Sequence, residues 1–586
     1  MNRSLVLLIG LSLAAPAFAQ NSPDDIVLRS MTDELERSRT LRIPGLEAPY
    51  FIEFTLDDAH VFSTAAALGA TLSNSDNRLR VPRVKVRVGD AKFDNTNYIY
   101  SDFGSGGGES APVDNDYRVL RRGWWLAADR AYKGAVESIA RKRAALKNVT
   151  QNENLPDLWP APPAQQKLPA RPAASATNAV WVERIRTLSA TFLDYPEVVA
   201  STVSFNTTRS TFSMVNTEGT VLQRPEPLTH LQASAAAFAP DGMTVRDSLS
   251  LPRTEEKSVP PQEELSKSIS QLAENVRALT KASVGENYSG PVLFEGIAGP
   301  QVLAELLAPN FALGRRPVGE PGRQIPFLAS ELENRIESKI LPDFLTIIDD
   351  PTKKEWNGAS LLGSYEIDEE GVVPKPVTLV EKGRLKTFLL TRQPVRGQQG
   401  TNGRARLPGG FGAWQASISN LFVNSSESVK AADLRKQFLK LVTDRQKPWG
   451  IVVKRMDFPS GASNEEARRL IQAAQQSGAV RPVSAPVLIY KVFPDGREEL
   501  IRGVRFRGLT IRSLRDIVAV SEEQYPLHYL NNMLPFALMS GGGYVAPASV
   551  IGPALLFEDL ELERPTDDVP KLPLVPAPEL RAATKK

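Results

Sequence analysis

The chain contains no cysteine among its 586 residues. Its fold must therefore form without disulfides, and neither a thiolate metal ligand nor a cysteine nucleophile is available. Only three histidines are present, His60, His230 and His528, and no two of them are near each other in the sequence. A metal site made of several histidines from one local motif is therefore excluded as well.

The length and the charge balance narrow the class of protein. At roughly 100 to 200 residues per domain, the chain is too long for one simple core and predicts about three or four domains. Lysine plus arginine (70) nearly balance aspartate plus glutamate (67), which leaves a net charge of +3. Domains that bind nucleic acid are usually strongly basic. We therefore expect a globular protein without a nucleic-acid partner.

The N-terminus has the layout of a secretory signal peptide. Arg3 precedes the apolar run from Leu5 to Ala15, and the small-residue pattern Ala17-Phe18-Ala19 follows. That run is only about 11 residues long, whereas a helix that spans a bilayer needs about 20. We expect cleavage after Ala19 and a secreted, periplasmic protein with no stable membrane insertion. A retained N-terminal membrane anchor is the alternative.

Shifts in composition divide the rest of the chain. Residues 155–178 are rich in proline and alanine and favour a linker. Strand and helix patterns occur on both sides of it, whereas short β segments dominate after Pro291. We predict an α+β fold with these parts: a signal peptide (1–19), an N-terminal α/β region (20–154), the linker (155–178), a middle α/β region (179–285), a predominantly antiparallel β domain (286–564) and a disordered tail (565–586).

Hydrophobic periodicity predicts the longer elements. Helical spacing predicts a helix over 22–39 with Ser22 as its N-cap, a second over 124–146 with Trp125 on its apolar face, and a third over 262–281. Alternation of apolar and polar residues predicts strands at 50–56, 84–88, 202–206 and 209–215, and a hairpin over 378–390.

Three features invite a functional interpretation, but each has a simpler one. The glycine run 104–109 lacks the Lys-Ser/Thr pair of a phosphate-binding loop, which favours a flexible loop. His60 and His528 can be catalytic or metal ligands, but isolated histidines are more often structural. Five arginines can contact phosphates, although a solvated sheet face is favoured: Arg502, Arg505, Arg507, Arg512 and Arg515.

The C-terminal half resembles the TldD/PmbA family, the modulators of DNA gyrase, whose TldD-type members are zinc metallopeptidases. The segments that carry the resemblance occur in the family's order: Gly290 to Phe294, Tyr365 to Pro374, Glu381 to Lys386, Thr401 to Arg404, and Met539 to Gly542 before a final apolar strand at Ala554 to Phe557. The resemblance implies a metallopeptidase-like β domain preceded by an α/β region.

The resemblance also implies where a zinc site would lie. Active family members carry HExxxH on a helix, with both histidines expected on one face, and a later cysteine ligand. The matching positions here are Ala304 and Pro309 for the histidines and Ser540 for the cysteine, and Glu305 keeps the glutamate. Alanine and proline side chains offer no lone pair to a metal, and a serine hydroxyl is a poor zinc ligand. We also expect Pro309 to end the helix early.

These residues lead to three hypotheses. The first is a catalytically impaired homologue, like the PmbA branch that lacks HExxxH, which needs no zinc, assembles with a TldD-like subunit or with itself, and helps to process short or unfolded peptides. Glu305 is then the sole candidate catalytic residue. The second is an active peptidase whose metal is held by His528 or by carboxylates such as Glu295, Glu305, Asp368 and Glu369. The third is a periplasmic peptide-binding or scaffold protein.

Overall fold

The computed structural model describes residues 25–99, 111–147, 155–168, 178–320, 327, 329–408, 413–457, 483–531 and 545–564. The predicted signal peptide and the C-terminal tail lie outside these ranges. In the described part of the chain, helices and strands are mixed and the sheets are largely antiparallel, which confirms the predicted α+β fold. None of the described helices is long and apolar enough to cross a membrane.

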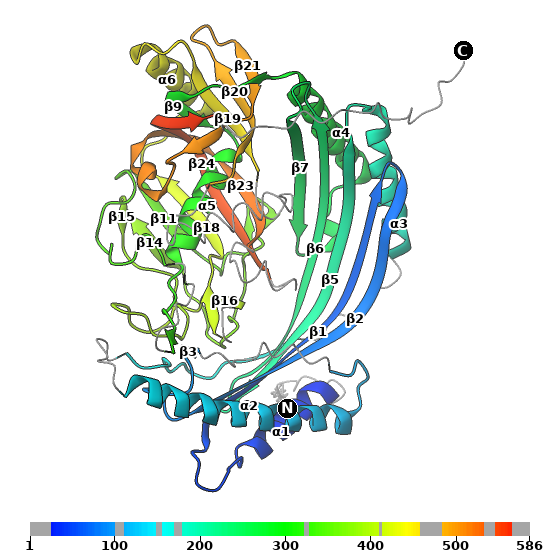
Figure 1. Cartoon of the computed structure of the whole chain (residues 1–586), viewed down its shortest axis with the longest axis vertical. Coiled ribbons are helices and arrows are strands. Elements are labelled where there is room, and N and C mark those ends of the chain that lie inside the picture. Colours follow the sequence, from blue (N-terminus) through cyan, green and yellow to red (C-terminus); the bar gives the residue numbers. More distant parts are fainter. Residues whose placement is uncertain are drawn as a thin grey trace, which may run out of the picture.

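A curved sheet of six strands dominates the N-terminal half (Figure 1). Its strands are β1 (Pro49–Ala67), β2 (Ala70–Val88), β4 (Gln165–Lys167), β5 (Ala200–Asn216), β6 (Val221–Phe238) and β7 (Thr244–Arg253). The strand order is β2-β1-β5-β6-β4, and β7 also pairs with β6. The central pair, β1 and β5, comes from opposite sides of residues 155–178, so one sheet joins the N-terminal and middle regions. The boundaries of these regions stay predictions.

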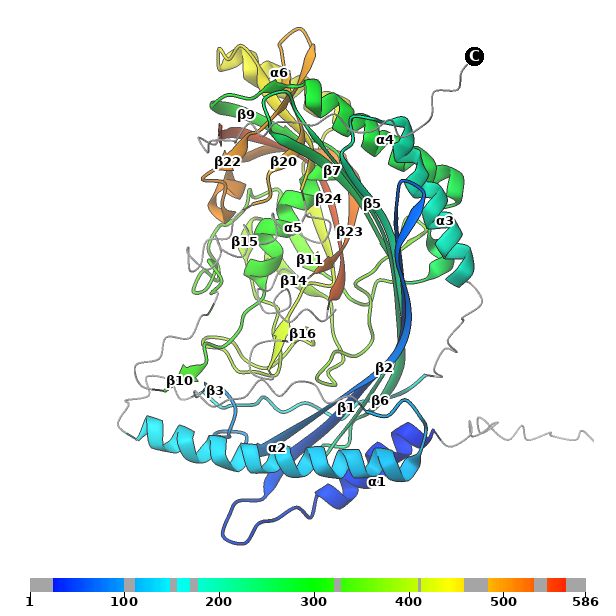
Figure 2. The same cartoon turned by 45° about the vertical axis from the view of Figure 1, so that its right-hand side comes forward.

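Four helices pack on this sheet in two groups: α1 (Ile26–Ser38), α2 (Tyr117–Leu146), α3 (Asn178–Ala190) and α4 (Gln262–Lys281). The helices α3 and α4 cover the convex side near one end of the sheet, and α1 and α2 lie at the other end (Figure 2). Each group has its own hydrophobic core, because the two sets of buried residues form separate clusters. The long strands therefore connect two cores.

The C-terminal half lies on the concave side of this curved sheet (Figure 2). It is built on a 12-stranded sheet in the order β15-β14-β11-β18-β24-β9-β19-β20-β21-β8, with β22 and β23 also paired with β24. The strands are β8 (Ser283–Val284), β9 (Tyr288–Phe294), β11 (Leu345–Asp349), β14 (Val377–Glu381), β15 (Arg384–Leu385), β18 (Asn420–Ser425), β19 (Gly450–Met456), β20 (Pro486–Val492), β21 (Glu498–Arg502), β22 (Arg505–Arg507), β23 (Ile517–Asn531) and β24 (Ala546–Glu563).

Two helices and several short elements complete this half. The helices are α5 (Ala298–Phe311) and α6 (Ala431–Asp444), and a 3-10 helix, η4, spans Ile511–Asp516. Three small sheets pair β3 (Tyr98–Ile99) with β10 (Val318–Gly319), β12 (Glu355–Trp356) with β13 (Ala359–Ser360), and β16 (Ala405–Pro408) with β17 (Trp414–Ala416). In the described residues of the N-terminal half, two further 3-10 helices occur, η1 (Thr191–Asp194) and η2 (Glu256–Ser258).

All three predicted helices are present, and α1 and α2 begin at other residues than predicted. Helix α4 spans the predicted residues. Helix α1 begins later than predicted, because the Asp25 carboxylate, not Ser22, caps it by accepting hydrogen bonds from the amides of Val27 and Leu28. In α2 the predicted apolar face is confirmed at Tyr132 and Ile139, which are buried, but was wrong at Trp125, which is 41% exposed. Its neighbour Trp124 is buried and stacks on Phe54, with the ring centroids 5.2 Å apart.

The strand predictions were too short. The segments predicted at 202–206 and 209–215 form one continuous strand, β5, which pairs along its length with β1 and β6. Between the two segments, Thr207 is buried and Thr208 is half-buried in the sheet, so the gap in the alternation does not end the strand. The predicted hairpin is confirmed, since β14 pairs antiparallel with β15 around the turn at Lys382 and Gly383.

Candidate functional site

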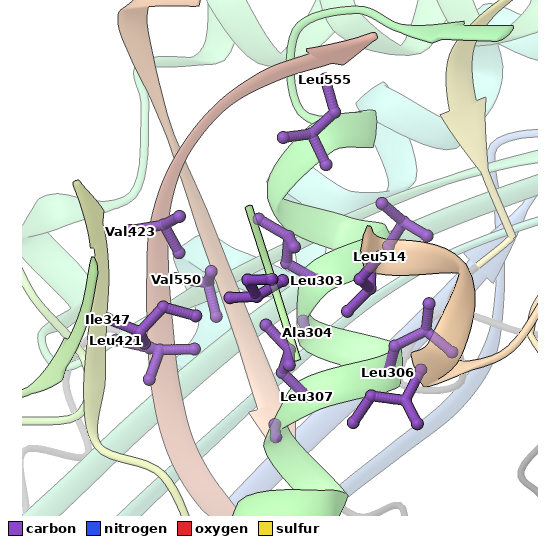
Figure 3. Close-up of a cluster of buried hydrophobic side chains, with 14 of the residues drawn as sticks. Leu303, Ala304, Leu306, Leu307, Ile347, Leu421, Val423, Leu514, Val550 and Leu555 are labelled. Atoms are coloured by element: carbon purple, nitrogen blue, oxygen red, sulfur yellow. The ribbon is translucent and has the colours of Figure 1, made fainter. Parts of the chain in front are cut away.

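Helix α5 carries three of the four positions that the sequence singled out, Ala304, Glu305 and Pro309. All residues of this helix are buried except Pro309. A helix that is apolar on nearly all sides is a core helix. Figure 3 shows it beside β11, β18 and β24, with leucine, isoleucine and valine side chains between them. Helix α5 is therefore a central support of the C-terminal half.

The two positions that match the family histidines have different environments. Ala304 is fully buried within the apolar cluster (Figure 3), whereas Pro309 is half-buried. Residues five apart point about 140° apart around a regular α-helix, so the expectation that both share one face is wrong for α5. Pro309 does not end the helix early either, because α5 continues to Phe311.

Glu305 is buried, with 2% of its surface exposed, and its carboxyl group faces one backbone amide and one side-chain amide. Its carboxylate accepts a hydrogen bond from the Ser484 amide at 2.6 Å, and Gln301, one turn earlier, donates to it at 3.4 Å. Burial raises the pKa of Glu305 from its ordinary 4.5 to about 8, although these two hydrogen bonds oppose the shift. At neutral pH the group is therefore largely protonated.

Gln301 and Glu305 together hold two chain segments against α5. The Gln301 side-chain amide also donates to the carbonyls of Met456 and Asp457, at 3.2 and 3.3 Å. The Asp457 amide in turn donates to the Ala485 carbonyl at 2.9 Å. The polar side of α5 thus binds the end of β19 and the chain that leads into β20. This is a structural role that needs no metal.

The fourth position, Ser540, lies outside the described residues. It falls between Asn531, the last residue of β23, and Ala546, the first residue of β24.

Each of the three histidines contacts a different polar side chain. His60 lies 3.0 Å from the Asp76 carboxylate, and His230 hydrogen-bonds Ser250 at 2.8 Å. His528 Nδ1 lies 2.9 Å from the Ser549 hydroxyl. Burial lowers the pKa of His528 to about 4, helped by the charge of Arg253, so the ring is neutral at pH 7.

The carboxylates named as candidate metal ligands have other partners. Glu295 pairs with Arg435 at 2.6 Å, and Glu369 pairs with Arg224 at 2.7 Å. Asp368 accepts hydrogen bonds from backbone amides, among them those of Val372 and Ala405. Within the described ranges, no three His, Asp or Glu side chains lie together so that they could hold a metal ion. The structure does not bring these candidates together.

The residues around α5 do not fit zinc. Two of the positions implied by the resemblance have hydrocarbon side chains, and Ala304 is enclosed by other hydrocarbon groups. Zinc sites use three or four nitrogen, sulfur or oxygen ligands. Of the three α5 positions that the resemblance implies, only Glu305 offers an oxygen, and its carboxyl group already accepts the Ser484 and Gln301 hydrogen bonds.

Sequence reasoning missed a buried polar network that supports this half of the protein. The side chains of Arg404 and Asp349 are both fully buried, and their ion pair has an N–O distance of 2.6 Å. Asp349 also accepts hydrogen bonds from the amide and the hydroxyl of Ser419. Arg404 stood out only as part of a family segment. No sequence signal linked it to a carboxylate 55 residues away.

Comparisons with known proteins agree with this architecture. Residues 290–464 match the family model of the PmbA/TldA metallopeptidase C-terminal domain. A curated protein from Archaeoglobus fulgidus, described as a metalloprotease, is 37% identical over 81 residues. That alignment covers 14% of this chain and 18% of the relative, so the chain spans about a fifth of the length of that protein.

Solved structures share the fold across almost the whole chain. A protein from Thermotoga maritima, described as a modulator of a DNA gyrase, matches with a TM-score of 0.57 and 14% identity, covering 91% of this chain and 99% of that one. TldE from Thermococcus kodakarensis matches with a TM-score of 0.55 and 12% identity, over 91% and 100% of the two chains. Residues 290–464 thus match the C-terminal domain of the PmbA/TldA metallopeptidases, and the fold of the chain is similar to that of TldE and of the gyrase modulator.

Proposed function

We propose that the chain is an exported metallopeptidase homologue that has lost its own zinc site and acts as the partner of an active TldD-like peptidase on short or unfolded peptides. The observation that carries this proposal is the environment of α5. Where the resemblance places two histidines, the chain has Ala304 in an apolar core and Pro309. The fold similarity to TldE across the whole of that chain is consistent with such a role.

The state of Glu305 supports the same proposal. In a metallopeptidase site, a glutamate acts on a water molecule that the metal has activated. Here the carboxylate is buried, its pKa is raised to about 8, and it accepts the Ser484 amide hydrogen bond. Without a metal, a protonated carboxyl in this position has no activated water to act on.

Export is the second part of the proposal, and it rests on the sequence. Arg3, the apolar run that follows it and Ala17-Phe18-Ala19 have the layout of a cleaved signal. Mass spectrometry of the protein purified from its own cells should find Gln20 as the first residue. A mature chain that still carries Met1 to Ala19 would contradict the periplasmic assignment.

Peptide hydrolysis tests the impaired-partner proposal directly. The chain alone should not cleave unstructured peptides, and a TldD-type protein from the same cell envelope should cleave them better when this chain is added. Light scattering of the mixture then distinguishes a mixed complex from a homo-oligomer. Chelator-sensitive hydrolysis by the chain alone, abolished by Glu305→Gln, would favour the active-peptidase alternative. Peptide binding without hydrolysis or partner would favour a scaffold.

A further inference from the structure

A small cavity lies on the C-terminal half, between the turn over residues 331–340 and the 3-10 helix η4. Its volume is about 160 Å³. Leu332 and Ile340 from the turn and Ile511 from η4 line it, and all three belong to the hydrophobic core around α5. Leu514 of η4 is fully buried beside α5 (Figure 3). Both walls are therefore anchored in the core, which fixes the shape of the cavity.

Four cationic side chains and one carboxylate line the same cavity. Arg335 and Lys339 come from the turn, and Arg512 and Arg515 from η4, whereas Glu331 is the carboxylate. The two pairs are far apart in the sequence, so the fold brings them together. The lining thus has a formal charge of +3, from four positive groups and one negative group.

These cations have little compensation inside the protein. Lys339 pairs with Asp343 at 3.0 Å. In the part of the chain that the structure describes, Arg335, Arg512 and Arg515 have no carboxylate partner, and Arg515 Nε donates only to the Arg512 carbonyl, at 3.4 Å. Arg502, from the same arginine-rich stretch, differs because it pairs with Asp241 at 3.0 Å. Unpaired like charges around one cavity repel each other unless an anion lies between them.

The shape and the surroundings of the cavity limit the ligand. The apolar floor suits a hydrocarbon part, and the guanidinium groups suit oxyanions, to which arginine can donate two parallel hydrogen bonds. Exposed acidic residues lie close in the sequence on both sides, at Glu333, Glu337 and Asp516. These carboxylates would repel an extended polyanion such as a nucleic acid, so a small ligand fits better.

We propose that this cavity binds a small organic ligand with several negative charges, either a phosphate ester or a polycarboxylate. The site is separate from α5 and Glu305, and the inference does not depend on the proposed function. The proposal also gives Arg512 and Arg515 a binding role. The interpretation as a solvated sheet face does not apply to them, because both lie in the 3-10 helix η4.

Calorimetric titration of the full chain tests the proposal, with inorganic pyrophosphate and citrate as probes at low ionic strength. At least one probe should bind. The double variant Arg512→Gln with Arg515→Gln should weaken binding about tenfold or more, because each lost charge-assisted hydrogen bond lowers the affinity. Both side chains are exposed, so the variant should keep the Tm of the wild type. Tighter binding of pyrophosphate would identify a phosphate ester, and tighter binding of citrate a polycarboxylate.

The matched control is Arg507→Gln with Lys440→Gln, which removes the same charge from exposed positions outside the cavity. It should bind the probe as the wild type does. The proposal is wrong if neither probe binds, or if the control weakens binding as much as the cavity variant. Tighter binding of a short oligonucleotide than of either probe would also overturn it. If the arginine variant loses Tm, Lys339→Gln gives the same test from the opposite wall.

Discussion

At the scale of single residues, Glu305 has the most informative environment. The sequence singled it out as the position that matches the motif glutamate, but it could not predict that the side chain is buried and bound to the Ser484 amide. That contact joins residues 179 positions apart, and local sequence patterns carry no information about such a distance. The same limit applies to the Arg404–Asp349 pair. Sequence alone therefore named the candidate residues without their partners.

Glu305→Gln should make the stability less dependent on pH. The folded-state pKa of Glu305, about 8, is above the ordinary value of 4.5, so the folded chain holds a proton that the unfolded chain releases between these values. This group therefore lowers stability as pH rises from about 5 to 8. Glutamine can still accept the Ser484 hydrogen bond and does not titrate. Urea unfolding at pH 5.5 and 8 should show a smaller pH-dependent loss in the variant; an unchanged loss would contradict the raised pKa.

At the scale of elements, the sequence predicted which segments are helices better than where strands end. The amphipathic spacing of residues 262–281 predicted both ends of α4 correctly. Strand β5 was split in two because Thr207 and Thr208 interrupt its alternation of apolar and polar residues, and pairing on both edges by β1 and β6 overrides that interruption. Pro309 was expected to stop α5, yet the tertiary core around the helix carries it through to Phe311.

Helix α5 and strand β24 pack so closely at Gly299 that adding one methyl group there tests the contact. A Cβ atom on Gly299 would lie 2.2 Å from the Pro553 carbonyl oxygen, so helix and strand would have to separate. Gly299→Ala should therefore destabilise the protein by about 1–3 kcal/mol. Gly134→Ala is the control, because Gly134 lies in α2 with no atom near its Cβ position. There alanine should stabilise by about 0.5–1 kcal/mol. Equal effects of both changes on urea unfolding would argue against this packing.

At the scale of the whole molecule, ion pairs tie the curved sheet to the C-terminal half. Arg246 of β7 pairs with Asp457 at 2.6 Å, and Asp247 of β7 pairs with Arg455 of β19 at 2.7 Å. These reciprocal pairs cross between regions that the sequence divided into separate parts. The division into regions was predicted from composition. No local sequence pattern predicted that ion pairs would join the middle region to the C-terminal half.

Arg392 provides the test at this scale. Its guanidinium group is 2% exposed and forms two hydrogen bonds of 2.7 Å to Glu218, which lies between β5 and β6. Arg392→Gln leaves that carboxylate without its partner and should cost about 3 kcal/mol. Arg143→Gln removes an exposed pair with Glu47 and should change stability by less than about 1 kcal/mol. Similar losses in both variants would show that the Arg392 pair does not hold the halves together.

The central claim of the proposal is that this chain has no zinc site of its own, and metal analysis of the protein from its native compartment tests it most directly. Elemental analysis of the purified chain, separated from any TldD-type protein, should find far less than one zinc per chain, and Glu305→Gln should leave that value unchanged. One tightly held zinc per chain that survives dialysis, and that Glu305→Gln removes, would contradict the claim.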